Sequence, residues 1–524
     1  MVLLLESSGK SLKSIKQLDC CKPRSNTMKK KILSLAVVAG IAGGLATTAQ
    51  AAMHINHNGL GEALVFPFFS AVQGEDSANT TNINIVNTTG DYKAVKVRFI
   101  EAMNSQEVLD FNLYLSPEDH WSGVIAVDAG TVSTGASIKT TDNSCTVPQL
   151  GGAAGQAQFN GYTTTADGVT TRVQPFVNYK FLDDSVNGVE RTLEGYVEVI
   201  EMGTIDPTSP LAAAILHDTA GMPGDCSALV EAWSVNNGTP GTWLADADAD
   251  MLENTGGLYG YATVVNVNDG TAYGYDAVAV DDFQGVFAGI SLHAEPGDED
   301  PNLSSGQDTA TLFDGAAATD YAFAQPVDAV SALFMANSIS NDFFVDANFN
   351  GATDFVVTMP TKRFYVQSVP ALAPFNESWD STTSQACEQV GVSSWDREEA
   401  VTVSSSGPQF SPRPPQVTED AFVLCTEVSV ISLRETAASA VSSAVGASDN
   451  ILYGLPTGYA AGWSRMSFAT PVGAANTREL VDNGSQTVTG LPVTGFAVQR
   501  YTNGTLGGGS VLSNYAAAIQ HKAN

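Results

Sequence analysis

An alternation of apolar and polar residues over 95–121 is the strongest pattern in the chain. Apolar side chains alternate with lysine and arginine over 95–99, and with Asp, Asn and Tyr over 109–115. This period of two is typical of strands that bury one face. The polar segment 102–107 allows a hairpin, and Ser116-Pro117 ends the second strand. The pattern predicts two antiparallel strands of a sheet with one face toward a core.

Short strand-like segments separated by turn residues continue along the rest of the chain. They lie at 64–69, 82–87, 121–127, 173–181, 192–201, 257–267, 274–290, 355–360, 363–369, 421–433, 462–468 and 495–501. Apolar residues follow helical spacing instead over 210–217, 226–233 and 327–338. These patterns predict a mainly β fold of one or more antiparallel β-sandwiches with a small helical insertion.

The order of these patterns suggests a division of the chain. More than 450 residues follow residue 51, which is enough for two or three hydrophobic cores. We expect an N-terminal β-sandwich domain over 52–205, a helical insertion over 206–257 and a β-rich C-terminal region over 258–524.

The first 51 residues have the pattern of a targeting segment. Three lysines follow Met28, an apolar run spans 32–45, and Ala49-Gln50-Ala51 is a small-x-small cleavage site. This arrangement is that of a secretory signal peptide over 28–51, preceded by an upstream segment over 1–27. No later run of eighteen apolar residues predicts a transmembrane helix. We expect export through the Sec pathway to the cell surface or the extracellular medium.

The charge narrows the range of partners. The chain has 24 Lys and Arg against 56 Asp and Glu, a formal charge of −32, and loss of residues 1–51 would make it −38 because they hold eight basic and two acidic residues. Such a field repels nucleic acid and anionic lipid. Solubility in a salty medium explains the acidity without a specific ligand.

Four cysteines lie beyond the signal peptide: Cys145, Cys226, Cys387 and Cys425. An even number in an exported protein predicts disulfides, and four cysteines allow three pairings. Sequence order favours Cys145 with Cys226 and Cys387 with Cys425. None has the CxxC spacing of a zinc or redox site.

One segment has the spacing of a calcium loop. Side chains with oxygen ligands stand at loop positions 1, 3, 5 and 9, occupied by Asp346, Asn348, Asn350 and Asp354. Gly351 is at position 6, where such a loop turns sharply, but Val357 replaces the usual glutamate at position 12. Calcium binding therefore stays one interpretation, and a plain Asn/Gly turn is the other, which the missing glutamate favours.

Signatures of catalysis are missing from the sequence. It has no GxSxG, HExxH, GxxxxGK[ST] or strand-linked GxGxxG motif, and we predict no enzymatic activity. Aromatic side chains with polar neighbours could form a sugar-stacking platform, although core packing explains most of them. The aromatic candidates are Phe66, Phe68, Phe69, Tyr114, Trp121, Trp233, Trp243, Tyr259, Tyr261, Tyr273 and Tyr275.

Several segments resemble a family of uncharacterised secreted cell surface proteins of Gram-negative bacteria. The similar segments are GEALVFPFF, VKVRFIEAMNSQEVLDFNLYLSPEDHW, GYVEVIEMG, TDFVVTMPTKRFYV and GFAVQRYTNGTLGGGSVLSNYAAAIQHK. They spread over nearly the whole chain after residue 51. The resemblance implies export and a surface location, and it implies no site residue.

Together these observations suggest a secreted structural or adhesive protein of the cell surface that self-associates. A polysaccharide-binding protein with structural calcium is an alternative, and a glycoside hydrolase with a carboxylate pair is another. Lys93, Lys96 and Arg98 lie on one segment of an otherwise acidic protein. We expect them to form an exposed cationic strand face that contacts an acidic neighbouring copy.

Overall fold

The computed structural model describes residues 51–524, apart from 74–77, 128–134, 153–160, 180, 182–187, 286–287, 316, 400–419, 436–442, 472–476, 507 and 510. Residues 1–50, which hold all but the last residue of the predicted signal peptide, lie outside the described residues. Strands hold 50% of the structure and helices 9%. The predicted mainly β class with few helices is therefore confirmed.

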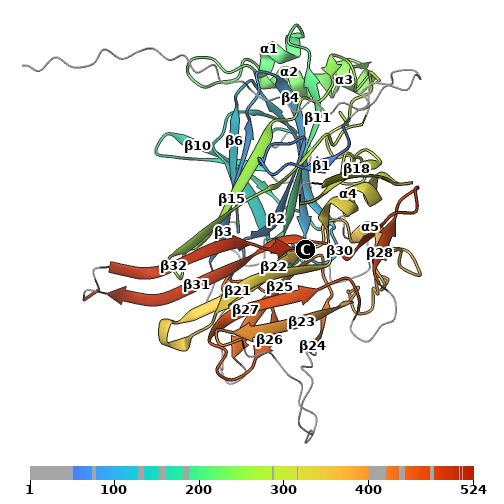
Figure 1. Ribbon diagram of the computed structural model, residues 1–524. Helices are drawn as coiled ribbons and strands as arrows, with labels where there is room; N and C mark the ends of the chain where they lie inside the picture. Colours follow the sequence, from blue (N-terminus) through green and yellow to red (C-terminus); the bar gives the residue numbers. More distant parts are fainter. Residues whose placement is uncertain are drawn as a thin grey trace, which may run out of the picture. The chain divides into compact units, whose positions relative to one another are not determined.

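Two sheets form a first sandwich, as Figure 1 shows. One has eight strands, in the order β1 (His54–Ile55), β17 (Val278–Asp281), β2 (Ala63–Ser70), β11 (Glu194–Ile205), β4 (Tyr92–Glu101), β5 (Glu107–Leu115) and β8 (Cys145–Val147), with β14 (Met251–Leu252) beside β11. The other has the order β16 (Thr271–Asp276), β15 (Leu258–Asn266), β3 (Asn79–Asn87), β6 (His120–Val127), β7 (Ala136–Thr140), β10 (Val169–Pro175) and β9 (Tyr162–Ala166).

The apolar residues that alternate along these strands fill the space between the two sheets. Val95, Val97 and Phe99 of β4 pack in one core with Ile83 and Ile85 of β3. The predicted hairpin is β4–β5, in which Val97 pairs with Phe111. The period of two therefore marks the inward face of each strand.

Strands β15–β17 belong to this first sandwich, although the predicted boundary at residue 258 places them in the C-terminal region. Residues 258–266 of β15 pair with 79–87 of β3, and β17 pairs with β2. These partners are far apart in the sequence, so local periodicity carries no information about the pairing.

Two five-stranded sheets form a second sandwich. Their orders are β24 (Asp420–Leu424), β23 (Glu388–Asp396), β27 (Ala461–Ser467), β21 (Ser338–Phe344), β33 (Lys522–Ala523), and β26 (Ile451–Leu455), β25 (Val428–Glu435), β22 (Gly351–Thr358), β31 (Thr494–Leu506), β32 (Val511–Gln520). All pairs are antiparallel except β25 with β26.

The two sandwiches share a core of their own. Phe68 and Tyr196 of the first sandwich pack with Val356 and Phe496 of the second. The Tyr196 hydroxyl also donates to the carbonyl of Pro360 at 3.1 Å. Because apolar side chains and a buried hydrogen bond cross the junction, the two sandwiches form one packed body.

The predicted helical insertion is present and covers the outer face of the eight-stranded sheet at one end (Figure 1). It contains α1 (Pro210–Ile215), α2 (Cys226–Ala232) and α3 (Thr242–Ala245), and the side chains of Ser209 and Asp225 cap the first two. Trp243 stacks on Tyr114 of β5 with ring centroids 5.2 Å apart. The aromatic residues of the insertion are therefore the anchors that hold it on the sheet.

Smaller elements complete the structure. They are β12 (Val235–Asn236) with β13 (Thr239–Pro240), β18 (Thr309–Asp314) with β19 (Ala317–Ala322), β20 (Met335–Ala336) with β30 (Leu491–Pro492), β28 (Glu479–Val481) with β29 (Thr487–Thr489), the helices α4 (Pro326–Phe334) and α5 (Arg363–Val366), and the 3₁₀ turns Val189–Leu193 and Ala347–Phe349. Within the described residues, no helix combines the length and apolarity that a bilayer-crossing segment requires.

The structure contains both disulfides that sequence order favours. Cys145 of β8 is bonded to Cys226 at the start of α2, and Cys387 is bonded to Cys425. The first ties the helical insertion to the first sandwich. The second joins the segments next to β23 and β24 in the second sandwich.

Candidate functional site

The cationic residues of β4 are buried, so the prediction of an exposed cationic strand face is wrong. Lys93, Lys96 and Arg98 are each fully buried. Their outer side is covered because the helical insertion and the second sandwich both pack on this sheet. A period of two identifies one apolar face, and it leaves open whether the other face meets water or protein.

Each buried cation of β4 is paired with carboxylates of the neighbouring strands. Lys96 Nζ lies 2.8 Å from Asp110 Oδ2 of β5. Arg98 lies 2.8 Å from Glu107 Oε2 and also contacts Glu198 of β11. Buried ion pairs of this kind hold strands in one register, because a shift would leave charges unpaired in the core.

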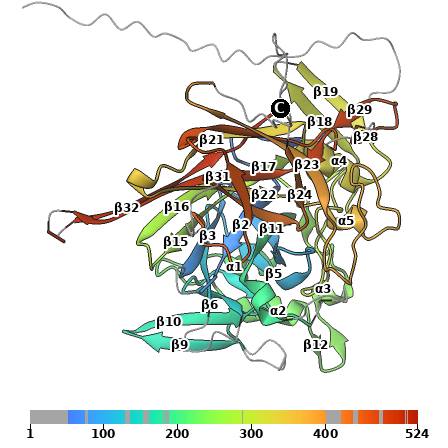
Figure 2. The same cartoon turned by 90° about the horizontal axis from the view of Figure 1, so that it is seen from below.

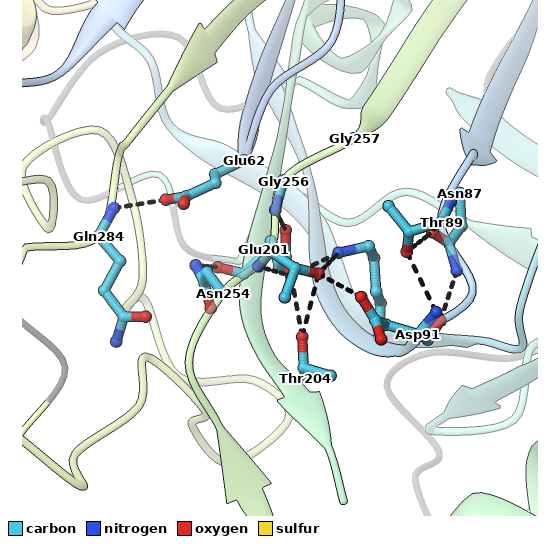
Figure 3. Close-up of polar contacts among 12 residues, drawn as sticks. Glu62, Asn87, Thr89, Asp91, Glu201, Thr204, Asn254, Gly256, Gly257 and Gln284 are labelled. Carbon is cyan, nitrogen blue, oxygen red and sulfur yellow. Dashed lines mark hydrogen bonds and ion pairs between the residues drawn. The ribbon is translucent and has the colours of Figure 1, made fainter. Parts of the chain in front are cut away.

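Figure 3 shows Glu201, the acid of the third pair, and its surroundings. Lys93 Nζ donates to Glu201 Oε1 at 2.6 Å and to Thr255 Oγ1 at 2.9 Å. Glu201 also accepts from the backbone N–H groups of Thr255 at 3.1 Å and Gly256 at 3.0 Å. Burial raises the pKa of Glu201, while Lys93 acts in the opposite direction. These donors occupy the carboxylate of Glu201, so the network holds the 254–257 segment against β11. A carboxylate bonded in this way is poorly suited to act as a catalytic acid or base.

The carboxyl group of Glu62 lies at the edge of the same view. The Gln284 backbone N–H donates to Glu62 Oε2 at 2.7 Å (Figure 3). Burial, with Glu201, Asp281 and Asp282 nearby, raises the pKa of Glu62 to about 8. This shift favours the protonated form of Glu62 at neutral pH. Its backbone N–H donates to the Val280 carbonyl of β17, and this bond and the one from Gln284 indicate a structural role.

The four residues predicted to bind calcium divide between a turn and a buried strand. Asp346 Oδ1 accepts from the backbone N–H and the side-chain amide of Asn348, both at 2.9 Å, and Asn350 is left-handed with φ 47°. Asp354, by contrast, is buried on β22, where its carboxylate accepts from Ser443 and Val445. The turn thus brings Asp346 and Asn348 together, and Asp354 is engaged elsewhere. Calcium binding stays a prediction.

Most of the aromatic candidates for sugar stacking are core residues. Those that are buried are Phe66, Phe68, Phe69, Tyr114, Trp121, Trp233, Trp243 and Tyr273. Tyr275 is partly buried and stacks on Phe496 with ring centroids 4.6 Å apart. Tyr259 and Tyr261 of β15 are 36% and 40% exposed on the outer face of their sheet. Core packing therefore explains most of the aromatic residues that were candidates for sugar stacking.

A pocket of about 480 Å³ lies between the two sandwiches. Glu194 lines it and accepts from the backbone N–H of Ser448 at 3.1 Å, and from the Ser448 hydroxyl. Burial, with Asp449 nearby, raises the pKa of Glu194 to about 7. These bonds connect β11 to the segment before β26, so Glu194 links the two sandwiches. No local pattern in the sequence marks this contact.

The β31–β32 hairpin projects from the second sandwich. Both views show it extending past its neighbours (Figures 1 and 2). Strand β32 has ten residues, VLSNYAAAIQ, with no charged side chain, and in the described chain β31 is its one strand partner. Val511, Leu512 and Tyr515 are 55%, 57% and 55% exposed. An uncharged edge strand of this length is a template for pairing with another strand.

Potential metal ligands do not cluster in the part of the chain that the structure describes. No group of three or more His, Cys, Asp or Glu side chains there could hold a metal ion. No family model, curated protein or solved structure matches this chain. The geometry of its own residues is therefore the basis for a functional proposal.

Proposed function

We propose that this protein is a secreted structural protein of the cell surface that self-associates by pairing β32 of one copy with β32 of another, without catalytic activity. The observation that carries this proposal is that, among the described strands, only β31 is hydrogen-bonded to β32, although β16 of the first sandwich lies close to it. Strand β32 is the longest edge strand of the described sheets, since each of the others has six residues or fewer. Unpaired N–H and C=O groups along such an edge gain partners when a second strand is added.

The lack of charge on β32 favours a second copy as the partner. Copies with a formal charge of −32 repel one another over most of their surface. The hairpin has one charged side chain among its described residues, Arg500, which is buried and lies against Asp269. The edge is therefore a place where two copies can approach without bringing like charges together.

The composition of the strand also suits antiparallel pairing with itself. A two-fold axis between Tyr515 and Ala516 would place Tyr515 of each copy opposite Ala516 of the other. Ala517 is small and exposed, whereas Ala516 and Ala518 pack partly against the core shared by the two sandwiches. The contact is thus self-complementary and needs no other partner. The two disulfides support the secreted part of the proposal, because disulfides persist in oxidising compartments.

The test is to place a positive charge on the edge. The substitutions Tyr515→Lys and Ala517→Lys lie on one face of β32, and lysine on an edge strand opposes strand addition. We expect the wild type to form dimers or larger assemblies, and both variants to be monomeric, by size-exclusion chromatography with light scattering and by negative-stain imaging.

A matched control separates the edge from a general effect of charge. Val169→Lys adds the same charge at an exposed position of β10, which lies between β7 and β9 and is not an edge strand. This variant should assemble like the wild type. A monomeric wild type, or lysine variants of β32 that assemble normally, would refute the proposal.

A further inference from the structure

Lys96 of β4 and Asp110 of β5 are in contact, but their geometry differs from that of the neighbouring pair. Lys96 Nζ lies 2.8 Å from Asp110 Oδ2, and the two side chains are 0% and 9% exposed. Within the described structure, Lys96 Nζ nevertheless has no acceptor in hydrogen-bond geometry. Lys93, by contrast, donates to both Glu201 and Thr255. The Lys96 amine therefore touches a carboxyl group without being held in a regular hydrogen bond.

A β-bulge places a second acid of β5 on the same face of the sheet. Asp110 pairs with Arg98, but after a register shift Glu107 pairs with Ile100. Arg98 and Ile100 are two residues apart on β4 and point to one face, so their partners Asp110 and Glu107 share that face. Without the extra residue, positions 107 and 110 would point to opposite faces. The bulge thus brings Glu107 to the side where Lys96 and Asp110 meet.

The surroundings of Glu107 suit it to proton transfer. Burial raises the pKa of Glu107; Arg98 acts in the opposite direction, and Asp110 adds to the rise. A carboxyl group near charged neighbours in a buried site can accept a proton and return it. Glu107 can therefore serve the reaction of the two groups beside it.

The segment 294–297 closes this side of the hairpin. The Gly297 backbone N–H donates to Asp110 Oδ2 at 3.0 Å, and the Asn112 side-chain amide donates to the Ala294 carbonyl at 2.9 Å. An N–H at a carboxyl oxygen stabilises the negative charge that develops there when a nucleophile adds to the carbon. An amine, a carboxyl group and a fixed donor are thus assembled where most water is excluded.

We propose that Lys96 and Asp110 react to form an intramolecular isopeptide bond, a covalent cross-link between β4 and β5. The buried ion pair is the arrangement from which this bond forms. The modification goes beyond self-association through β32 and is independent of it.

The reaction is a condensation that releases water. A proton first passes from the Lys96 ammonium to the Asp110 carboxylate, which leaves a neutral amine and a carboxylic acid. The Nζ lone pair then forms a bond to Cγ of Asp110, and Glu107 relays a proton from the nitrogen to the departing hydroxyl group. The C–O bond breaks, one water molecule leaves and a neutral amide remains. Glu107 ends in the protonation state in which it began, and nothing is oxidised or reduced.

Contact and burial together favour the amide. Groups held in contact react as if at effective concentrations on the order of 10⁵ M or more, because no entropy is lost in bringing them together. The amide also removes two charges from the core, where ions carry a desolvation cost. The balance that favours separate ions in water is therefore shifted toward the cross-link.

The test is peptide mapping of the purified protein after reduction, unfolding and digestion with trypsin. Trypsin cleaves after free lysine and arginine, so an unmodified chain releases the peptides 94–96, 97–98 and 99–139. The cross-link blocks cleavage after Lys96. We expect 94–98 joined to 99–139, with a mass lower by one water molecule than the two peptides together. Fragmentation of the joined peptide should place the bond at Lys96 and Asp110.

Variants of the three residues give the mapping its contrast. Lys96→Arg keeps the positive charge but has no amine that forms an amide, and Asp110→Ala removes the acceptor, so neither should yield the joined peptide. Glu107→Gln keeps both partners and should slow cross-linking by about a hundredfold, as loss of a proton relay does. Lys93 is the control within the same digest. Its amine is bonded to Glu201 and Thr255, and cleavage after it should be complete.

Three results would overturn the inference. Release of 94–96 and of unmodified 99–139 from the wild type would leave Lys96 and Asp110 as an ordinary ion pair. Loss of water within 99–139 without joining would indicate ring closure at Asp110. A joined peptide lighter by one ammonia molecule would place the bond at Asn112, which pairs with Lys96 across the hairpin. None of these results bears on assembly through β32, because that strand contains neither partner.

Discussion

Arg98 is a charged residue of the protein core. Its guanidinium group is fully buried on β4 and contacts Glu107 and Glu198. Burying such a pair costs desolvation energy, and the mutual attraction of the charges offsets it only while every partner is present. At the residue scale, the stability of the first sandwich therefore depends on complete ion pairs.

We predict that Arg98→Met strongly destabilises the protein. The change leaves Glu107 and Glu198 buried without their cation, and breaking a buried pair in this way costs about 3 to 5 kcal/mol. Urea unfolding followed by circular dichroism measures the loss. Lys522→Met is the control, because Lys522 is exposed on β33 and should change stability little. Equal stability of the two variants would contradict a structural role for Arg98.

Glu427 is a carboxyl group with no hydrogen-bond partner on either oxygen in the described structure. It is buried at the junction of the sandwiches, facing Lys362, Glu101 and Arg191. Burial raises its pKa to about 8, and Lys362 acts in the opposite direction. Because the folded state binds this proton more tightly than the unfolded chain, the contribution to stability is full below pH 4.5 and is lost as pH rises through 8.

We predict that Glu427→Gln stabilises the protein relative to the wild type at pH 8 more than at pH 6.5. The buried histidines His293 and His521 have pKa values lowered to about 4, and they affect stability below pH 6.5. Between pH 6.5 and pH 8, the change of stability with pH therefore comes mainly from buried carboxyl groups. Thermal unfolding at both pH values measures the difference. Glu479→Gln, at an exposed position of β28, should show no such pH dependence. If the stability of both variants changed with pH in the same way, the raised pKa of Glu427 would be rejected as the cause.

At the scale of elements, the two disulfides stabilise different parts of the fold. They join residues 81 and 38 positions apart. The chain-entropy model assigns each about 4 kcal/mol, with little difference between them. Their structural effects differ more than their energies, since Cys145–Cys226 connects the helical insertion to β8 while Cys387–Cys425 lies within the second sandwich.

We predict that replacing Cys145 and Cys226 together by serine speeds amide hydrogen exchange in α1 and α2. These short helices are held to the sheet by the disulfide and by the aromatic contacts of the insertion, so loss of the first allows local opening. Exchange followed by mass spectrometry gives the rates. The corresponding double substitution of Cys387 and Cys425 is the control and should leave α1 and α2 as protected as in the wild type.

At the scale of the whole molecule, the acidic charge opposes contact between copies. A formal charge of −32 on the full chain produces repulsion that salt screens, with a Debye length of about 10 Å at 0.1 M. The uncharged β32 edge gains no attraction from this field. Self-association through β32 and association through charge complementarity therefore respond to salt in opposite directions.

We predict that raising the salt concentration strengthens self-association. Screening weakens the repulsion between acidic copies and leaves the main-chain hydrogen bonds of a β32 pair in place. Sedimentation at low and moderate salt measures the dimer fraction, with Tyr515→Lys as a control that should stay monomeric throughout. Weaker association at higher salt would indicate a contact between opposite charges and would count against the β32 edge.

Local patterns in the sequence predicted a substantial part of this fold. The period of two over 95–115 identified β4 and β5, and helical spacing found α1 and α2 in the insertion. The order of the cysteines favoured the pairing that the structure contains. The strands and helices depend on residues close to one another in the sequence, and the disulfide pairing depends on only four cysteines.

The tertiary structure decided what covers each element. Lys96 and Arg98 lie on the face of β4 that the alternation predicts to meet solvent, yet both are buried by segments that pack on that face of the sheet. The partner of β15 and the free edge of β32 are likewise settled by segments far away in the chain. Periodicity shows which side of a strand is apolar, whereas only long-range packing determines whether the opposite side meets water, protein or a ligand.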